Sequence, residues 1–534
     1  MSRKNEIIFL LIILIIAGFF RLWQLNSIPP GLYPDVALNG NEALQGLKIH
    51  DFKVFYPENN GREGLMMWLI ALSFSIFGVS VWSMKIVAAV AGILTVFGLY
   101  LLTKELFSRI LKESDSRIIA LASSFFLAIS FWHTNFSRIG FRAILLPFVL
   151  VFAFYFLFKG LNSRKLFNFI ISGIFFGLGF YTYTSYRLIV LPVFLVLIIW
   201  WFIYRKQNLQ KKFLLSAFYF LLSIFIVALP LGIYFLESPQ DFISRAGPVS
   251  VFAAANPLKA LGESLIGHLA MFNFYGDSNW RHNYSGSPML FWPVGILFLI
   301  GFILSIKEIL KKSNYQSLST FYFLISTFFV MLLPGVLTYE GIPHSLRVIG
   351  AIPTVYIFVG LGSWWLYEKF RENVKNKNLL FVSVALFLVA VSMSEFNKYF
   401  FEWGKSKEVE GAFTKNFADM GYFLNSLPEN YQKYVIVNES GTPVPFPNGI
   451  PMPVQTIMFM ENAKYGSLQS TYLLPANLEQ IKIDERQTVI IPMKYDENLF
   501  NDLKAKFPQG KIQKENEIWL YEINPKIINS EVGD

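Results

Sequence analysis

The sequence contains no cysteine and little charge. Without cysteine the chain has neither disulfides nor thiolate metal ligands, so any domain outside a membrane must hold together by packing alone. Only 15% of its 534 residues are Asp, Glu, Lys or Arg, whereas a soluble domain carries about a quarter. Hydrophobic residues make up 54% of the chain and aromatic residues 17%. Much of the surface must therefore face lipid, which predicts an integral membrane protein.

Several functional signatures are also missing. There is no Walker A loop, no G-x-G-x-x-G after a strand and no H-E-x-x-H. No internal repeat is visible, which weakens the case for a transporter built from duplicated halves. The formal charge of +10 lies mostly in short loops between apolar runs, so it does not indicate a nucleic-acid partner.

Long apolar runs dominate what is present. A helix needs about 20 mostly apolar residues to span a bilayer. No small-residue cleavage site follows the first run, which therefore predicts an anchor and not a removed signal peptide. The eleven predicted spans are Ile7–Leu25, 83–103, 118–134, 142–158, 166–183, 188–204, 213–236, 289–306, 318–338, 347–367 and 379–395. We expect an all-α polytopic domain over residues 1–395.

The loop charges predict the orientation of these spans. With a cytoplasmic N-terminus, every cytoplasmic segment carries at least two Lys or Arg, and the outer loops are poorer in Lys. The apolar run Met66–Phe77 is too short to span and is expected to lie in the membrane interface. Counting it as a span would place the basic loop 104–117 outside. The pattern predicts a multi-pass protein of the plasma (inner) membrane.

Three long segments then fall on the extracytoplasmic side. They are a first outer loop at about 26–82, a large outer loop at about 237–288, and a polar tail over 396–534. The tail has strand-like runs at 434–437 and 489–492 and helical patterns near 409–426 and 496–506. This alternation predicts a small α/β domain.

The first outer loop holds the acidic candidates. Asp35 follows the first span closely, on a stretch rich in Pro and Gly that indicates a turn. It is either a reactive carboxylate near the membrane surface or a solvated turn residue. Glu63 precedes the interfacial helix, where it either caps that helix or belongs to a site.

Arginines recur at the outer ends of spans. Arg138 and Arg142 have i, i+4 spacing, which predicts one shared helix face. Two like charges near lipid are costly unless an anion lies between them. Arg187 occupies a similar position two spans later. Bidentate phosphate binding suits such side chains, and snorkelling to the headgroups is the alternative.

The remaining candidates lie in two later loops. One contains Asp277, Arg281 and His282, and the other contains His344 and Arg347. All five His of the chain map to the outer side or to the outer end of a span. These histidines either form a metal site or are structural. No pair has the spacing of two metal ligands on one helix, which weakens the case for a metal site.

The order of these parts resembles bacterial members of glycosyltransferase family 39, in the GT-C superfamily. Relatives include the protein O-mannosyltransferases and the aminoarabinose transferase that acts on lipid A. The resemblance covers about residues 7–395. It rests on one span, a long acidic outer loop and an interfacial helix, followed by Gly78-Val79-Ser80, Lys85, the Arg138/Arg142 segment, Arg281-His282-Asn283 and His344-Ser345-Leu346-Arg347.

The resemblance implies a role for each candidate. Asp35 would be the catalytic carboxylate. The family usually has an adjacent Asp-Glu pair, whereas Val36 replaces the second acid here, which leaves Glu42 or Glu63 as substitutes. The implied donor-phosphate ligands are Arg138, Arg142, Arg187 and Arg347, and the implied acceptor or sugar ligands are Arg281, His282, His344 and Asp277.

The implied function is transfer of a sugar from a polyprenyl-phosphate donor, with inversion, to a hydroxyl of a protein, lipid or wall-glycan acceptor. The residues neither demand nor exclude a divalent cation. A lipid-linked sugar transporter and a non-catalytic scaffold are the alternatives. A transporter would place charges along the middle of several spans, whereas the charges here gather at span ends.

Overall fold

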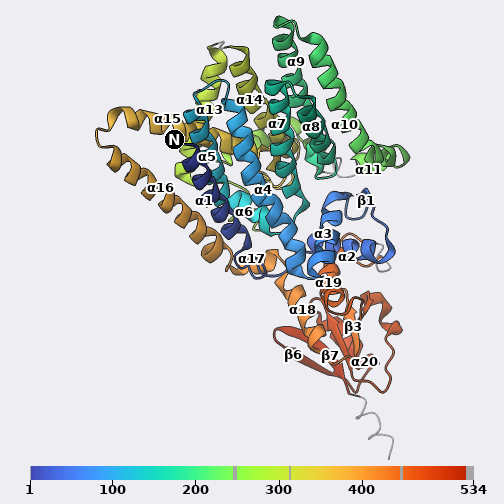
Figure 1. Cartoon of the computed structure of the whole chain (residues 1–534). Helices are drawn as coiled ribbons and strands as arrows, with labels where there is room; N and C mark the ends of the chain where they lie inside the picture. The colour runs from blue at the N-terminus through green and yellow to red at the C-terminus, as the bar shows by residue number, and fades with distance from the viewer. Residues whose placement is uncertain (1, 244–248, 312–313, 445–448, 525–534) are drawn as a thin grey trace, which may run out of the picture.

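A computed structural model describes residues 2–243, 249–311, 314–444 and 449–524. It consists of a bundle of long helices with a small mixed domain at one end (Figure 1). The last helix of the bundle runs to Trp403 before the chain enters the small domain. The predicted domain boundary at 395–396 therefore lies inside this helix.

Nine helices in the described ranges are long and apolar enough to cross a membrane. They are α1 (Arg3–Leu22), α4 (Val81–Phe107), α7 with its leading turn (Arg142–Ser163), α9 with its leading turn (Thr184–Lys206), α10 (Gln210–Glu237), α13 (Trp292–Leu310), α14 (Tyr315–Val336), α15 with its leading turn (Ile349–Asn373) and α16 with its closing turn (Lys377–Trp403). Each coincides with a predicted span, so the polytopic helical fold is confirmed.

The two other predicted spans are not single long helices. In place of 118–134 the structure has α5 (Glu113–Ile129) and α6 (Phe131–Arg138), bent by 57°. The bend is stabilised because the Ser130 side chain caps α6 and the Arg21 guanidinium donates to the carbonyl of Ala128 at the end of α5, at 2.8 Å. α8 (Leu166–Gly179) has 14 residues, or roughly 21 Å of helix.

The loops predicted to be cytoplasmic lie together at the end of the bundle away from the small domain (Figure 1). Near the N-terminus, Glu6 forms an ion pair with Arg117 at 3.0 Å and another with Lys104. Farther along, Lys206 donates to the hydroxyl of Tyr315 at 2.8 Å. These contacts agree with the predicted alternation, while the side of the membrane on which this end lies stays a prediction.

The first outer loop is folded against the bundle. Its elements are α2 (Pro34–Ile49), β1 (Phe55–Tyr56), β2 (Arg62–Glu63) and α3 (Leu65–Phe77). The predicted helix over Met66–Phe77 is confirmed as α3, which buries Met67 and Ile70 and exposes Leu72 and Ile76. The large outer loop contributes α11 (Pro239–Ile243), α12 (Pro257–Ala270) and an irregular stretch before α13.

The tail forms a five-stranded mixed sheet of order β4-β3-β5-β7-β6. Its elements are α17 (Lys407–Ala412), α18 (Lys415–Ser426), β3 (Gln432–Ile436), α19 (Gln455–Tyr465), β4 (Thr471–Leu473), β5 (Thr488–Pro492), α20 (Glu497–Lys506), β6 (Lys511–Glu515) and β7 (Ile518–Ile523). Apolar side chains alternate along the strands, so α18 and α19 cover one face and α20 covers the other. The predicted α/β tail is confirmed.

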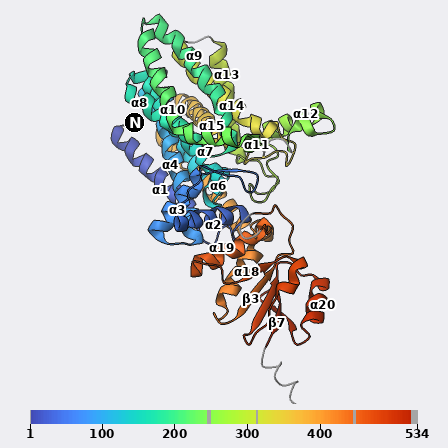
Figure 2. The ribbon, with the colours of Figure 1, turned by 90° about the vertical axis from the view of Figure 1, so that its right-hand side faces the viewer.

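The small domain docks on the first outer loop through α19, which lies beside α2 in both views (Figures 1 and 2). Asn41 of α2 donates to the side-chain oxygen of Gln455 at 2.8 Å and accepts from Asn462 at 3.0 Å. Thr456 donates to the carbonyl of Leu32 at 2.9 Å, just before α2 begins. The domain therefore fixes the position of α2.

Candidate active site

Asp35 lies in the first turn of α2. The helix begins at Pro34, where proline is favoured because its missing N–H would be unpaired in any case. The sequence predicted a turn here, and the structure instead places the carboxylate at the positive end of a helix. Asp35 is partly exposed. Its carboxylate forms no hydrogen bond or ion pair with any residue that the structure describes, so it is available to a ligand.

Arg281, in the large outer loop, lies close to the start of α2. Its guanidinium lies over the ring of Tyr33, 4.3 Å from the centroid. Asn135 of α6 donates to the Arg281 carbonyl at 2.8 Å and holds the loop against the bundle. The ring of Phe141 lies between the two loops, 5.7 Å from the Tyr33 ring and 6.3 Å from the His282 ring, measured between centroids. The start of α2, the large loop and the bend after α6 therefore converge.

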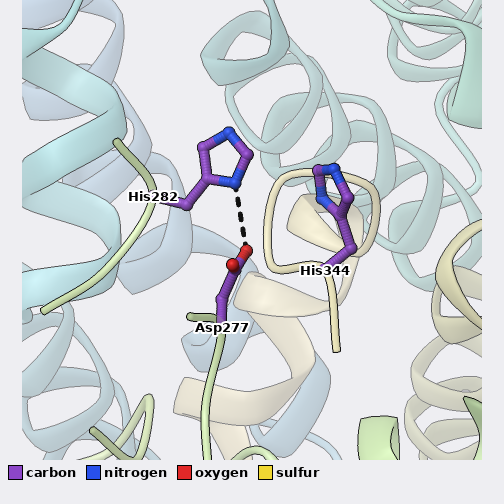
Figure 3. Close-up of side chains that lie close together, drawn as sticks. All are labelled: Asp277, His282 and His344. Carbon is purple, nitrogen blue, oxygen red and sulfur yellow. Dashed lines mark hydrogen bonds and ion pairs between the residues drawn. The ribbon is translucent and has the colours of Figure 1, made fainter. Parts of the chain in front are cut away.

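Asp277, His282 and His344 form a cluster next to this point (Figure 3). His282 Nδ1 lies 3.0 Å from Asp277 Oδ2, and the two histidine rings are 4.9 Å apart between centroids. The Ser345 N–H donates to Asp277 Oδ2 at 2.8 Å. Two loops that are far apart in the sequence are therefore joined through one carboxylate.

Burial controls the charge states of this cluster. Burial lowers the pKa of His282, although the Asp277 carboxylate opposes that shift. Burial also places the pKa of His344 well below its ordinary value. Burial alone would raise the pKa of Asp277, but the contacts of its carboxylate, first among them the hydrogen bond with His282, lower it to about 2. At neutral pH the cluster is thus an ionised carboxylate with two neutral imidazoles.

Glu63 and Arg142 form a buried ion pair. Glu63 Oε2 accepts from Arg142 Nε at 3.0 Å, and Glu63 Oε1 accepts from Thr184 at 3.1 Å. Glu63 is 2% exposed. Of the two alternatives for Glu63, capping of the following helix is not observed, since α3 has Gly64 at its N-cap and no side-chain cap. The ion pair neutralises both charges and stabilises the contact between β2 and the start of the span at Arg142.

Glu42 lies farther along α2 than Asp35. It pairs with the buried Arg62 at 2.6 Å, and it lines a cavity of about 260 Å³ together with Tyr56 and Glu58. Burial raises the pKa of Glu42, and the Arg62 charge opposes that shift. Glu42 and Glu63 are therefore each paired with an arginine, whereas Asp35 is not.

The predicted shared helix face of Arg138 and Arg142 is wrong. Gly140 has φ +78, a conformation that favours glycine, and it ends α6 before Arg142 begins the next span. Arg138 is fully buried. Its guanidinium donates to the carbonyls of Phe20, Gln24 and Ile28. These contacts fix the chain that leads from α1 to α2.

The other two predicted phosphate ligands lie nearer the surface. Arg187 donates to the carbonyl of Phe242 and stacks on its ring at 4.2 Å. Arg347 forms an ion pair with the exposed Glu340 at 3.0 Å. The structure therefore brings Asp35, Arg281 and the Asp277 cluster to one region, while Arg138 has a different environment.

Sequence reasoning gave no role to three residues that organise the site. Arg62 pairs with Glu42, Ser345 holds Asp277, and His268 accepts from the His344 backbone N–H at 3.1 Å. Ser345 and His268 lie beside or among the histidines already singled out, so proximity in the sequence was a signal. Nothing in the sequence pairs Arg62 with Glu42, which lies on another element.

Comparisons with known proteins agree with this architecture. Residues 65–231 match the family described as dolichyl-phosphate-mannose-protein mannosyltransferase. The fold is similar to the crystal structure of ArnT from Cupriavidus metallidurans bound to undecaprenyl phosphate, with TM-score 0.55, 12% identity and 98% of both chains covered. The apo state of that protein gives TM-score 0.55 and 11% identity over the same shares. No curated protein matches the sequence.

A further solved structure is similar over part of its length. The archaeal oligosaccharyltransferase AglB from Archaeoglobus fulgidus, in complex with an inhibitory peptide and a dolichol-phosphate, has TM-score 0.47 and 15% identity, with 82% of this chain and 63% of that chain covered. The likeness to ArnT extends over 98% of this chain and shows that the two proteins share a fold. The family match covers residues 65–231, which is less than half of the chain.

Proposed function

We propose that this protein is a membrane glycosyltransferase that moves a sugar from a polyprenyl-phosphate carrier to an acceptor hydroxyl. The observation that carries the proposal is Asp35, a carboxylate at the start of α2 with no partner in the described part of the chain, within a fold that ArnT shares. ArnT was solved with undecaprenyl phosphate. A lipid carrier of the same chemistry, with its tail among the spans and its phosphate near Asp35, is the donor expected here.

Asp35 acts as the general base. The acceptor oxygen attacks the anomeric carbon, and its proton passes to the Asp35 carboxylate. The bond from the anomeric carbon to the phosphate oxygen breaks, and the phosphate leaves with both electrons. Attack opposite the leaving group inverts the anomeric centre. A phosphate whose charge is held needs no proton to leave, so Val36 in place of a second acid does not prevent the reaction.

Arg281 is the cation best placed to hold the donor phosphate. Within its guanidinium, only Nε has a hydrogen-bond partner among the described residues, the side-chain oxygen of Asn279 at 3.3 Å. Its stacking on Tyr33 places the rest of the guanidinium beside the start of α2. Planar guanidinium groups bind phosphate in a bidentate manner. Arg347 can contribute by releasing its exposed partner Glu340, since such surface ion pairs are weak.

We further propose that the reaction occurs on the extracytoplasmic face, with the small domain on the same side. The site and this domain lie at the end of the bundle opposite the basic loops (Figure 1). Positively charged loops stay in the cytoplasm. The acceptor is then a protein, lipid or wall glycan outside the membrane, reached next to the contact between α2 and α19.

The test uses purified protein, a panel of radiolabelled polyprenyl-phosphate sugars and crude envelope acceptors. Asp35→Asn should lower transfer about 10²–10⁴-fold, which is the usual contribution of general-base catalysis. Asp51→Asn is the matched control, because Asp51 is an exposed carboxylate on the same loop. It should transfer at the wild-type rate.

Two outcomes would overturn the proposal. Wild-type transfer by Asp35→Asn would remove Asp35 from the mechanism. Tight donor binding by the wild-type protein, with no transfer to any acceptor, would favour a transporter of the lipid-linked sugar or a scaffold.

A further inference from the structure

We propose that Asp277, His282 and His344 bind one divalent transition-metal ion of the Zn²⁺ type. One carboxylate oxygen and one ring nitrogen from each histidine lie within 4.8 Å of one another. Zinc ligands at 2.0–2.2 Å in a tetrahedral site are separated by roughly 3.3 Å. The His344 ring lies beside the paired Asp277 and His282 side chains in Figure 3.

The electronic state of these side chains suits a metal. Each imidazole presents one ring nitrogen toward the shared space, and a ring nitrogen without a proton offers a lone pair. Asp277 supplies a negative charge. His344 Nδ1 is a buried nitrogen with no hydrogen-bond partner among the described residues. This nitrogen is therefore able to accept a ligand without breaking a contact within the described residues.

A second layer of contacts holds the ligands in place. Asp277 Oδ1 accepts only from the Asn279 N–H, at 2.8 Å, and therefore keeps a lone pair for an ion. Asp277 Oδ2 is fixed by Ser345 and His282. The backbone beside the His344 ring is fixed by His268. Metal sites in proteins have such supporting contacts, which orient the ligands and raise affinity.

The ligand types select the kind of ion. Arg281 and Arg347 lie close to His282 and repel any cation, so the ligands must bind strongly. One carboxylate does not satisfy Mg²⁺ or Ca²⁺, which need several oxygen ligands. Strong imidazole ligands favour Zn²⁺ or a similar ion. Three protein ligands leave a position open to water or to a substrate oxygen.

The experiment measures binding of Zn²⁺ and Co²⁺ to the purified full-length chain, without turnover, so its result is separate from that of the transfer assay. After chelation and dialysis, the wild-type protein should take up one Zn²⁺ per chain by elemental analysis. Co²⁺ should give the visible absorption of a tetrahedral site. The absence of cysteine and the presence of only five histidines keep the background low.

Four variants locate the site. His282→Gln and His344→Gln should each weaken Co²⁺ binding at least tenfold. His50→Gln, which alters an exposed histidine at the end of α2, should leave binding unchanged. His344→Cys should retain the ion and add a thiolate-to-cobalt absorption band. That band reports coordination by residue 344 even if the glutamine variants fold poorly.

Wild-type protein with no stoichiometric Zn²⁺ or Co²⁺ would overturn the proposal. Binding that survives both glutamine variants, or a His344→Cys protein that binds Co²⁺ with no thiolate band, would do the same.

Discussion

At the residue scale, the arginines predicted to hold a phosphate are separated by what their guanidinium groups contact. Arg138 donates to carbonyls of the chain after α1 and is fully buried. Arg281 lies on the ring of Tyr33 with most of its donors unpaired among the described residues. Arg138 and Arg281 could both be identified as candidates from the sequence, because arginines at the ends of spans stand out. The sequence could not tell them apart, because their partners lie on other elements.

This difference predicts opposite effects of two substitutions. Arg138→Gln should lower the apparent melting temperature in detergent, since each buried carbonyl left without a donor costs about 1–3 kcal/mol. Arg281→Gln should keep the wild-type melting temperature and raise the donor KM. Thermal unfolding and donor titration of the same preparations give both readouts. An Arg138→Gln protein that melts normally but binds donor weakly would instead make Arg138 a phosphate ligand.

At the scale of helices, close backbone contact holds part of the bundle together. α13 and α15 approach at two glycines. A Cβ on Gly301 would lie 1.9 Å from the Phe358 carbonyl oxygen, and one on Gly362 would lie 2.0 Å from that of Leu297. Small residues allow helices in a membrane to pack this closely, because there is little hydrophobic driving force between them in lipid.

Gly301→Ala should therefore destabilise the protein, because the obstructing atom is backbone and cannot rotate away. Overpacking of this kind costs about 1–3 kcal/mol. Gly232→Ala in α10 is the matched control, since nothing lies within 4 Å of the added methyl group. It should be neutral or stabilising by up to about 1 kcal/mol, the helix preference of Ala over Gly. Equal melting temperatures for the two variants would contradict the close approach of α13 and α15.

Hydropathy predicts where the helices span the membrane but not how they bend or which side chains pair between them. Runs of apolar residues predicted the spans because a bilayer demands length and low charge. Hydropathy could not predict the bend between α5 and α6, because the bend depends on Arg21 of α1 donating to the carbonyl of Ala128. Hydropathy could not predict the ion pair of Glu63 and Arg142 either. Gly140 turns the chain between Arg138 and Arg142 and directs Arg142 toward β2.

At the scale of the whole molecule, the sequence predicted the two parts but not their contact. Periodic patterns in the tail indicated strands and helices near β3, β5, α18 and α20. The pairing of Asn41 with Gln455 joins residues 414 positions apart, and no local pattern encodes such a contact. The small domain thereby holds the helix that carries Asp35, so the position of the proposed base depends on both parts of the chain.

The absence of cysteine makes the predicted topology directly measurable, because a single introduced cysteine is the only thiol in the chain. Glu479→Cys lies on the exposed surface of the small domain, and Asn208→Cys lies in the exposed turn between α9 and α10. The basic residues around Asn208 should keep that turn in the cytoplasm. In intact cells, a membrane-impermeant maleimide should therefore label Glu479→Cys and not Asn208→Cys, and both should react after lysis. The reverse pattern would place the Asp35 site in the cytoplasm, where an acceptor outside the membrane could not reach it.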